Sequence, residues 1–140
     1  MQSKLFLDTA FVYALLNTRD EWHGPAVRWQ SRLSAESRPL LTTEFVLMEI
    51  GDGLAALRFR SVAAEAIRRL RSSTLVEVVP ATAGLVEEAF LLYAGRKDKD
   101  WGMTDCSSFV AMRARGLSDA LTMDLHFQQA GFHPLLLGSE

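Results

Sequence analysis

The sequence predicts an α/β fold in which a mostly parallel central sheet is covered by helices on both faces. Short segments rich in valine and leucine alternate along the chain with longer segments whose apolar residues recur at helical spacing. The 140 residues are 49% hydrophobic and 23% charged, which is typical of a globular protein with one buried core. The sequence shows no repeat, low-complexity segment or linker, so residues 1–140 are expected to form a single domain.

The first half of the chain begins with an apolar strand that leads directly into a helix. Asp20 is expected to cap the next helix. Pro25 is compatible with this helix because proline is tolerated near a first helical turn. Thr43 and Ser61 are expected to cap the two helices that follow. The expected elements are strands at residues 4–8, 40–42 and 75–79, and helices at residues 9–17, 20–37, 44–58 and 62–71.

The second half of the chain repeats the alternation of helices and strands. Thr82 and Thr104 are expected to cap two helices, which are separated by a charged connection at residues 96–100. Gly116 suits the left-handed position that ends a helix. The expected elements are helices at residues 82–93, 104–116 and 125–130, and strands at residues 120–123 and 134–137.

The composition excludes several classes of protein. A net charge of −2 is incompatible with a grossly basic nucleic-acid-binding protein, although an enzyme can contact RNA through a local basic patch. Cys106 is the only cysteine, so an internal disulfide is impossible and a reducing compartment is expected. No apolar run reaches the ~18 residues of a membrane helix and no signal peptide is evident, so we expect a soluble cytoplasmic chain.

Asp8 interrupts an otherwise apolar passage that covers residues 5–16. A buried charge without a partner costs several kcal/mol, so Asp8 is expected to have one. Asp124 follows another predicted strand, and ligand sites in open parallel sheets form beyond the carboxyl ends of the strands. Asp105 stands at the start of a predicted helix and could join the same edge. The alternative for Asp105 and Asp124 is that they only stabilise helix N-termini.

A fourth acid is expected from the helix at residues 44–58, which carries Glu44, Glu49 and Asp52. With ~100° of rotation per residue, Glu49 lies about 60° from Val46, at the margin of the apolar stripe of this helix. Glu44 falls nearly opposite the stripe, and Asp52 falls toward solvent. Glu49 is therefore the candidate, with an ordinary border residue of an amphipathic helix as the alternative.

Carboxylates that converge in this way need a cation. Two unit charges ~5 Å apart at an effective dielectric of ~20 repel by about 3 kcal/mol. Since the candidate ligands are all oxygens, the hard ions Mg²⁺ and Mn²⁺ are the natural choice. Such a site can activate water and offset the charge of a phosphodiester.

The chain resembles the PIN-domain proteins, and specifically the VapC-type ribonucleases of bacterial toxin–antitoxin pairs. The resemblance implies a three-layer α/β/α sandwich and a Mg²⁺- or Mn²⁺-dependent endoribonuclease. It implies that Asp8, Glu49, Asp105 and Asp124 are the metal ligands and catalytic acids, and that the hydroxyl of Thr104 supports the site. The segments that carry it are residues 6–9, 43–49, 101–109 and 121–127, followed by Gly131 and Phe132.

Some members of this family carry a further acid near the fourth position, where this chain has Leu125 and His126. The number of metal ions, one or two, is therefore open. Two roles stay open for His126 as well: contact with phosphate or water, and a purely structural role.

The resemblance also implies partners: an RNA substrate, an antitoxin and a second copy of the chain in a homodimer. An antitoxin would place an arginine or lysine against the four acids in place of the metal. The apolar surface for these contacts is expected around Trp22, Trp29 and Leu33 and along residues 46–57, unless these residues complete the monomer core.

Other functions are also considered. A housekeeping PIN nuclease of RNA processing would have the same acids and no antitoxin. A doubly wound binding or signalling module, such as a phospho-receiver, needs a paired acid after its first strand and a lysine near its last. Asp8 stands alone and no lysine follows Lys99. A degenerate PIN domain that acts only as a scaffold would not need all four acids.

Overall fold

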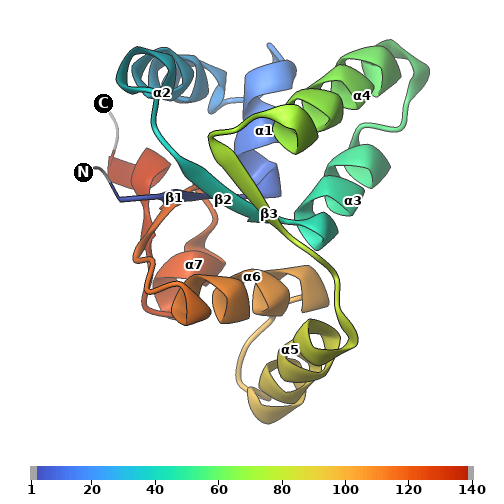
Figure 1. Cartoon of the computed structure of the whole chain (residues 1–140), viewed down its shortest axis with the longest axis vertical. Coiled ribbons are helices and arrows are strands. Elements are labelled where there is room, and N and C mark those ends of the chain that lie inside the picture. The colour runs from blue at the N-terminus through green and yellow to red at the C-terminus, as the bar shows by residue number, and fades with distance from the viewer. Residues whose placement is uncertain (1–2, 139–140) are drawn as a thin grey trace.

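The computed structural model describes residues 3–138, which form a three-layer α/β/α sandwich around one sheet of five parallel strands (Figure 1). This architecture confirms the predicted fold class. The strands are β1 (Leu5–Leu7), β2 (Leu40–Thr43), β3 (Val76–Val79), β4 (Asp119–Leu121) and β5 (His133–Pro134). The helices are α1 (Thr9–Leu16), α2 (His23–Glu36), α3 (Glu44–Gly53), α4 (Leu57–Ser72), α5 (Ala83–Gly95), α6 (Met103–Ala114) and α7 (Leu125–Gln129), and a 3₁₀ helix, η1, spans Leu135–Gly138.

The helices form two layers with the sheet between them. In Figure 1, α1, α2 and α4 lie on one side of the sheet, and α6 and α7 lie on the other. Helix α5 packs against α6 on the side away from the sheet. No helix within residues 3–138 has both the length and the apolar composition required to cross a membrane.

The strand order β3-β2-β1-β4-β5 places a topological switch point between β1 and β4. The chain builds outward from β1 through β2 to β3, and then returns to the other side of β1 with β4 and β5. Helices that follow adjacent strands at such a point leave toward opposite faces, which opens a crevice at the carboxyl edge. Asp8 and Asp124 follow the two strands concerned, so the topology brings them to this edge.

An aromatic cluster fixes the helices on the α6 side of the sheet. The ring of Phe109 on α6 makes edge contacts with Trp101 and Phe127, each with a centroid distance of 5.0 Å. The Trp101 indole Nε1 donates a 2.9 Å hydrogen bond to Gln129 Oε1 on α7. All three rings are buried. The cluster therefore holds the start of α6 beside α7, the two elements that carry Asp105 and Asp124.

Several predicted caps are confirmed. Thr43 Oγ1 accepts a hydrogen bond from the Val46 N–H at the start of α3, and Thr82 Oγ1 accepts one from Leu85 at the start of α5. Gly116 has a φ of 67°, the left-handed conformation expected after a helix.

The predicted boundary between the third and fourth helices is wrong. Helix α3 ends at Gly53 and α4 begins at Leu57, so Ser61 lies inside α4 and caps nothing. The glycines at 51 and 53 weaken the last turn of α3, and Leu54 turns into the core, where it is 5% exposed. Leu57, which lies within the helix expected at residues 44–58, is 91% exposed at the start of α4.

The predicted start of the second helix and the predicted extent of the last strand also differ from the structure. Helix α2 begins at His23, because Asp20 Oδ1 accepts a hydrogen bond from the Trp22 N–H and so stabilises the turn before the helix. The predicted strand at residues 134–137 is reduced to the two residues of β5, which pair with β4. The chain then coils into η1, where the Leu136 N–H donates to the Thr122 carbonyl.

The apolar surface predicted around α2 and α3 is mostly core. Leu33 and four residues of the segment 46–57 are buried, and Trp22 and Trp29 are half-buried against the core. The buried residues among these therefore complete the monomer core, which is the alternative stated above. The large apolar side chains that are exposed there are Val27 on α2, Met48 on α3 and Leu57 at the start of α4.

Candidate metal centre

Asp8 is buried at the carboxyl end of β1, where it is 5% exposed. Its Oδ2 accepts a 2.8 Å hydrogen bond from the hydroxyl of Thr122, which follows the neighbouring strand β4. The same Thr122 oxygen accepts a 3.1 Å hydrogen bond from the Asp124 N–H. One fully buried hydroxyl thus links the side chain of Asp8 to the main chain of Asp124. The role of Thr122 was missed from the sequence, because a threonine within a strand segment is common without any function.

Asp105 and Asp124 both act at helix N-termini, as the structural alternative expected. Asp105 Oδ2 accepts a 3.2 Å hydrogen bond from the Gly102 N–H, and Gly102 is the cap of α6. Asp124 Oδ1 accepts a 2.9 Å hydrogen bond from the His126 N–H at the start of α7. These hydrogen bonds orient the two carboxylates. They leave the carboxylates able to bind a ligand, because each oxygen has further lone pairs.

His126 joins these two acids. Its Nδ1 lies 2.9 Å from Asp105 Oδ2 and 3.5 Å from Asp124 Oδ1, so an N–H at this position donates to the acids. One ligand atom from each of these three residues lies within 4.8 Å of the other two. The sequence left the role of His126 open, and the structure places its imidazole in the cluster.

The carboxylates share one electrostatic field. Burial raises the pKa of Asp8 to about 7; the Thr122 hydrogen bond opposes this shift, and the charges of Asp105 and Asp124 add to it. Burial also raises the pKa of Asp105, against the hydrogen bond from His126. The protein alone therefore does not fully compensate the negative charge that it collects at this edge.

Glu49 approaches from α3 and lies outside the three-residue cluster. The hydroxyl of Tyr13 on α1 donates a 2.7 Å hydrogen bond to the main-chain oxygen of Glu49. Burial raises the pKa of Tyr13 to about 12, and the charges of Glu49, Asp52 and Asp8 contribute to this shift. Glu49 and Asp8 therefore both lie close enough to one phenol to act on it electrostatically.

Thr104 does not cap α6 as predicted. The cap is Gly102, and Thr104 lies within the first turn, where its carbonyl accepts a 2.7 Å hydrogen bond from the Ser107 hydroxyl. An extended conformation at Gly102, together with the bond from its N–H to Asp105, starts the helix before the threonine.

The donor set fits a divalent cation. Burial, with a smaller contribution from the neighbouring carboxylates, raises the pKa of Asp8 and of Asp105. A cation of charge +2 would favour the ionised carboxylates, and oxygen donors suit Mg²⁺ and Mn²⁺. Within residues 3–138, Asp105, Asp124 and His126 form the group that could hold such an ion, and the Asp8 carboxylate lies near enough to interact with both aspartates.

The raised pKa of Asp8 predicts how the stability of the metal-free protein depends on pH. The folded protein holds the Asp8 proton with a pKa of about 7, against 3.8 for the ordinary carboxyl. Folding therefore favours the protonated form, and stability from this group is lost as the pH rises from about 4 through 7. Asp8→Asn should be more stable than the unmodified chain at pH 8, by a few kcal/mol, and equal to it near pH 4.

Urea unfolding in the presence of a chelator, at both pH values, measures this difference. Asp98→Asn is the control, because its exposed carboxylate has a pKa lowered by Arg96 and should give no gain at pH 8. A gain for Asp8→Asn that is the same at both pH values would contradict the prediction.

Comparisons with known proteins agree with this geometry. A family model described as the PIN domain matches residues 5–133. The chain is 36% identical over 129 residues to the 23S rRNA-specific endonuclease VapC20 of two Mycobacterium tuberculosis strains, CDC 1551 / Oshkosh and ATCC 25618 / H37Rv. The match covers 91% of this chain and 95% of the relative.

Solved structures show the same fold. The crystal structure of M. tuberculosis VapC20, a sarcin-ricin loop cleaving toxin, superposes with a TM-score of 0.78 and 35% identity over 92% of this chain and 96% of that one. VapBC2 from Rickettsia felis, bound to a DNA fragment from their promoter, gives a TM-score of 0.66 at 14% identity, over 94% and 97% of the two chains. The chain resembles the VapC toxins in sequence and in structure, and it belongs to the PIN-domain family.

Proposed function

We propose that this chain is a metal-dependent endoribonuclease that hydrolyses RNA phosphodiester bonds, and that it is the toxin of a toxin–antitoxin pair. The observation that carries this function is the convergence of Asp8, Asp105 and Asp124 at the switch point of the sheet. Residues 1–140 act as one nuclease domain. Asp8, Glu49, Asp105 and Asp124 are the proposed ligands of Mg²⁺ or Mn²⁺, with the Thr104 hydroxyl in support.

In the proposed mechanism, the protein holds the acidic side chains in fixed positions through hydrogen bonds. A bound divalent cation supplies an activated water and offsets charge on the phosphate. Thr122 holds one oxygen of Asp8 in place, and the N–H of Gly102 does the same for Asp105. His126 Nδ1 bridges Asp105 and Asp124. Because these bonds exist before substrate binds, the acids need little rearrangement when the reaction begins.

The proposed substrate is 23S rRNA, since the relative with 36% identity is named as an endonuclease specific for it. A chain with a net charge of −2 must contact RNA through a local group of cations. The connection before α6 carries Arg96, Lys97 and Lys99; Arg96 and Lys99 form ion pairs with Asp98, which an RNA phosphate would have to replace. Asp105 lies in the first turn of α6. Arg96 stacks on Trp101 at 4.9 Å, which fixes the base of this connection.

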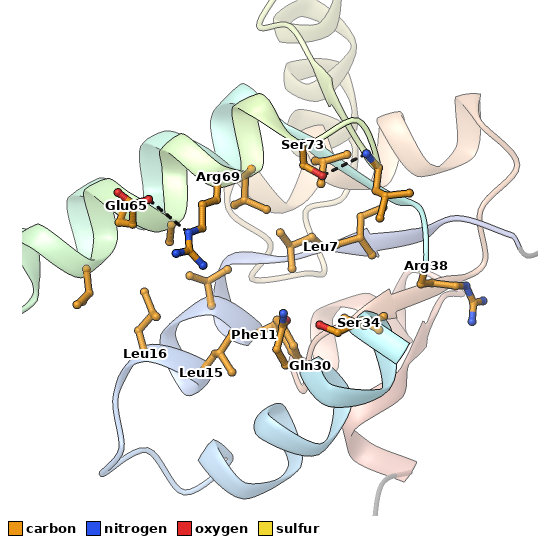
Figure 2. Close-up of a pocket in the computed structure, with 18 residues that line it drawn as sticks. Leu7, Phe11, Leu15, Leu16, Gln30, Ser34, Arg38, Glu65, Arg69 and Ser73 are labelled. Atoms are coloured by element: carbon orange, nitrogen blue, oxygen red, sulfur yellow. Dashed lines mark hydrogen bonds and ion pairs between the residues drawn. The ribbon is translucent and has the colours of Figure 1, made fainter. Parts of the chain in front are cut away.

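An apolar groove is the proposed seat of an antitoxin segment. It has a volume of about 470 Å³ and lies between α1, α2 and α4 (Figure 2). Leu7, Phe11, Leu15 and Leu16 point into it, and the Glu65–Arg69 ion pair lies at its margin. We propose that a segment seated here continues past Leu7, the residue before Asp8, and places a basic side chain against the acids in place of the cation. The VapBC structures with this fold support such a partner.

A homodimer is proposed through α5. Leu85, Ala89 and Leu92 face the core, while Val86, Phe90 and Tyr93 form a second apolar stripe at the same spacing. The three side chains of this second stripe are 42–50% exposed. A helix with apolar residues on two faces normally buries both, and a second copy of the chain offers the same stripe in return.

The first prediction for this function concerns RNA cleavage. Asp8→Asn should lower Mg²⁺-dependent cleavage of purified 23S rRNA at least about 100-fold, because it removes a charged ligand while the fold is kept. The measurement is the mapping of cut ends, with and without Mg²⁺, for both proteins. Cleavage by the variant at the rate of the unmodified chain would refute the assignment of Asp8.

The second prediction concerns the groove. Ala66→Arg places a long charged side chain in the groove and should prevent co-purification with the product of a short reading frame adjacent to the gene. RNA cleavage should be unchanged, because Ala66 lies on α4 and away from the acids. Ala35→Arg, at an exposed position of α2 outside the groove, is the control and should retain the partner. Partner binding by Ala66→Arg at full strength would count against this seat.

The third prediction concerns the oligomeric state. Light scattering at micromolar concentration should give the mass of a dimer or a larger species, and Phe90→Glu should reduce it to the mass of one chain. Leu57→Glu, which alters an exposed leucine outside α5, should keep the larger mass. A monomer for the unmodified chain across this range would rule out the dimer and leave the nuclease function standing.

A further inference from the structure

We propose that Tyr13 is a positioning residue for Glu49, and that position 53 is a glycine because the Tyr13 ring occupies the space of its side chain; this inference rests on the proposed metal-dependent function. Tyr13 lies on α1, five residues after Asp8, and Glu49 lies on α3. Neither Tyr13 nor Gly53 was among the residues that the sequence singled out.

The contact between the two helices is specific. The Tyr13 hydroxyl donates a 2.7 Å hydrogen bond to the main-chain oxygen of Glu49 itself. Within residues 3–138 the Glu49 carboxylate makes no hydrogen bond or ion pair of its own. The position of this carboxylate therefore depends on where the main chain of α3 is held, and Tyr13 holds it at that residue.

Gly53 makes this contact possible. A Cβ atom at position 53 would overlap with the Oη and Cζ atoms of Tyr13 and lie 2.8 Å from its Cε1. Contacts this close do not occur between real side chains, so any residue other than glycine would displace the ring. Gly51, in the same helix, is different: a Cβ there would meet Ile67 Cδ1 at 3.8 Å, an ordinary contact. The two glycines thus give a matched pair.

The surroundings of the phenol favour a role in the site over a role in packing alone. The charges of Glu49 and Asp8, two of the proposed ligands, act on Tyr13 together with the exposed Asp52, so the phenol lies within electrostatic reach of both ligands. A phenylalanine would fill nearly the same volume, and only the hydroxyl supplies the bond to Glu49. Loss of the Tyr13 hydroxyl therefore tests its effect on the position of Glu49 without opening a large cavity.

The test measures metal binding through the melting temperature, so it does not depend on catalysis. A cation that binds the folded acids raises the melting temperature with increasing concentration. Tyr13→Phe should increase the Mg²⁺ concentration needed for a given rise in melting temperature by about 10-fold or more, as expected for loss of a residue that orients a metal ligand. Gly53→Ala should have the same effect, and Gly51→Ala should leave this Mg²⁺ concentration unchanged.

A double-mutant cycle separates a role through Glu49 from a general effect on stability. Glu49→Gln should itself weaken the metal-dependent shift, and Tyr13→Phe in that background should change it no further. An equal effect of Tyr13→Phe in both backgrounds would overturn the role of Tyr13 and leave the proposed function standing. The same holds if Tyr13→Phe lowers the melting temperature without Mg²⁺ but leaves the Mg²⁺ concentration needed for a given rise unchanged. An unmodified chain that shows no metal-dependent shift would overturn the proposed function and this inference with it.

Discussion

The hydrogen bond from the Thr122 hydroxyl to Asp8 is the interaction on which the site depends. It joins the ends of β1 and β4, the two strands on either side of the switch point. Because Asp8 is almost completely buried, its charge has little access to water, and a polar partner at this place is required. The second hydrogen bond of Thr122, from the Asp124 N–H, sets the position of the next acid. A single buried hydroxyl therefore relates two carboxylates that stand far apart in the sequence.

The other acids reach the same edge through helix packing. The Trp101–Phe109–Phe127 cluster fixes the start of α6 against α7, which brings Asp105 to His126. Helix α3, which carries the proposed ligand Glu49, is joined to α1 by the Tyr13 hydrogen bond. The three aspartates follow β1, lie at the start of α6 and precede α7, so the sheet and the helices packed on it must be in place before these acids have their final geometry.

Much of this arrangement follows from the sequence, and the parts that do not follow have physical reasons. The need of Asp8 for a partner could be predicted because an acid in an apolar passage has few other roles, and the Thr122 hydroxyl meets it. The proximity of Asp105 and Asp124 could be predicted because both precede helices at one edge of the sheet, although Gly102 and not Thr104 caps α6. The strand order could not be predicted, since it depends on which short strands pair across the core. Thr122 and Tyr13 were missed because each acts through one long-range hydrogen bond, and residue type alone does not reveal such a bond. The end of α3 was placed wrongly because the glycines at 51 and 53 weaken its last turn, and the apolar spacing of the segment does not reveal this.

The central position of β1 in the sheet has a consequence for the synthesis of the protein. Strand β1 precedes the other strands in the chain, and one of its two edges pairs with β4. The hydrogen bond between Thr122 and Asp8 spans 114 residues of sequence. A nascent chain that has not yet released β4 from the ribosome has neither Thr122 nor Asp124, and one edge of β1 is bare. Closing so long a loop comes late, because its entropy is lost before its contacts form. The topology therefore delays a complete set of acids until β4 and the residues that follow it have left the ribosome.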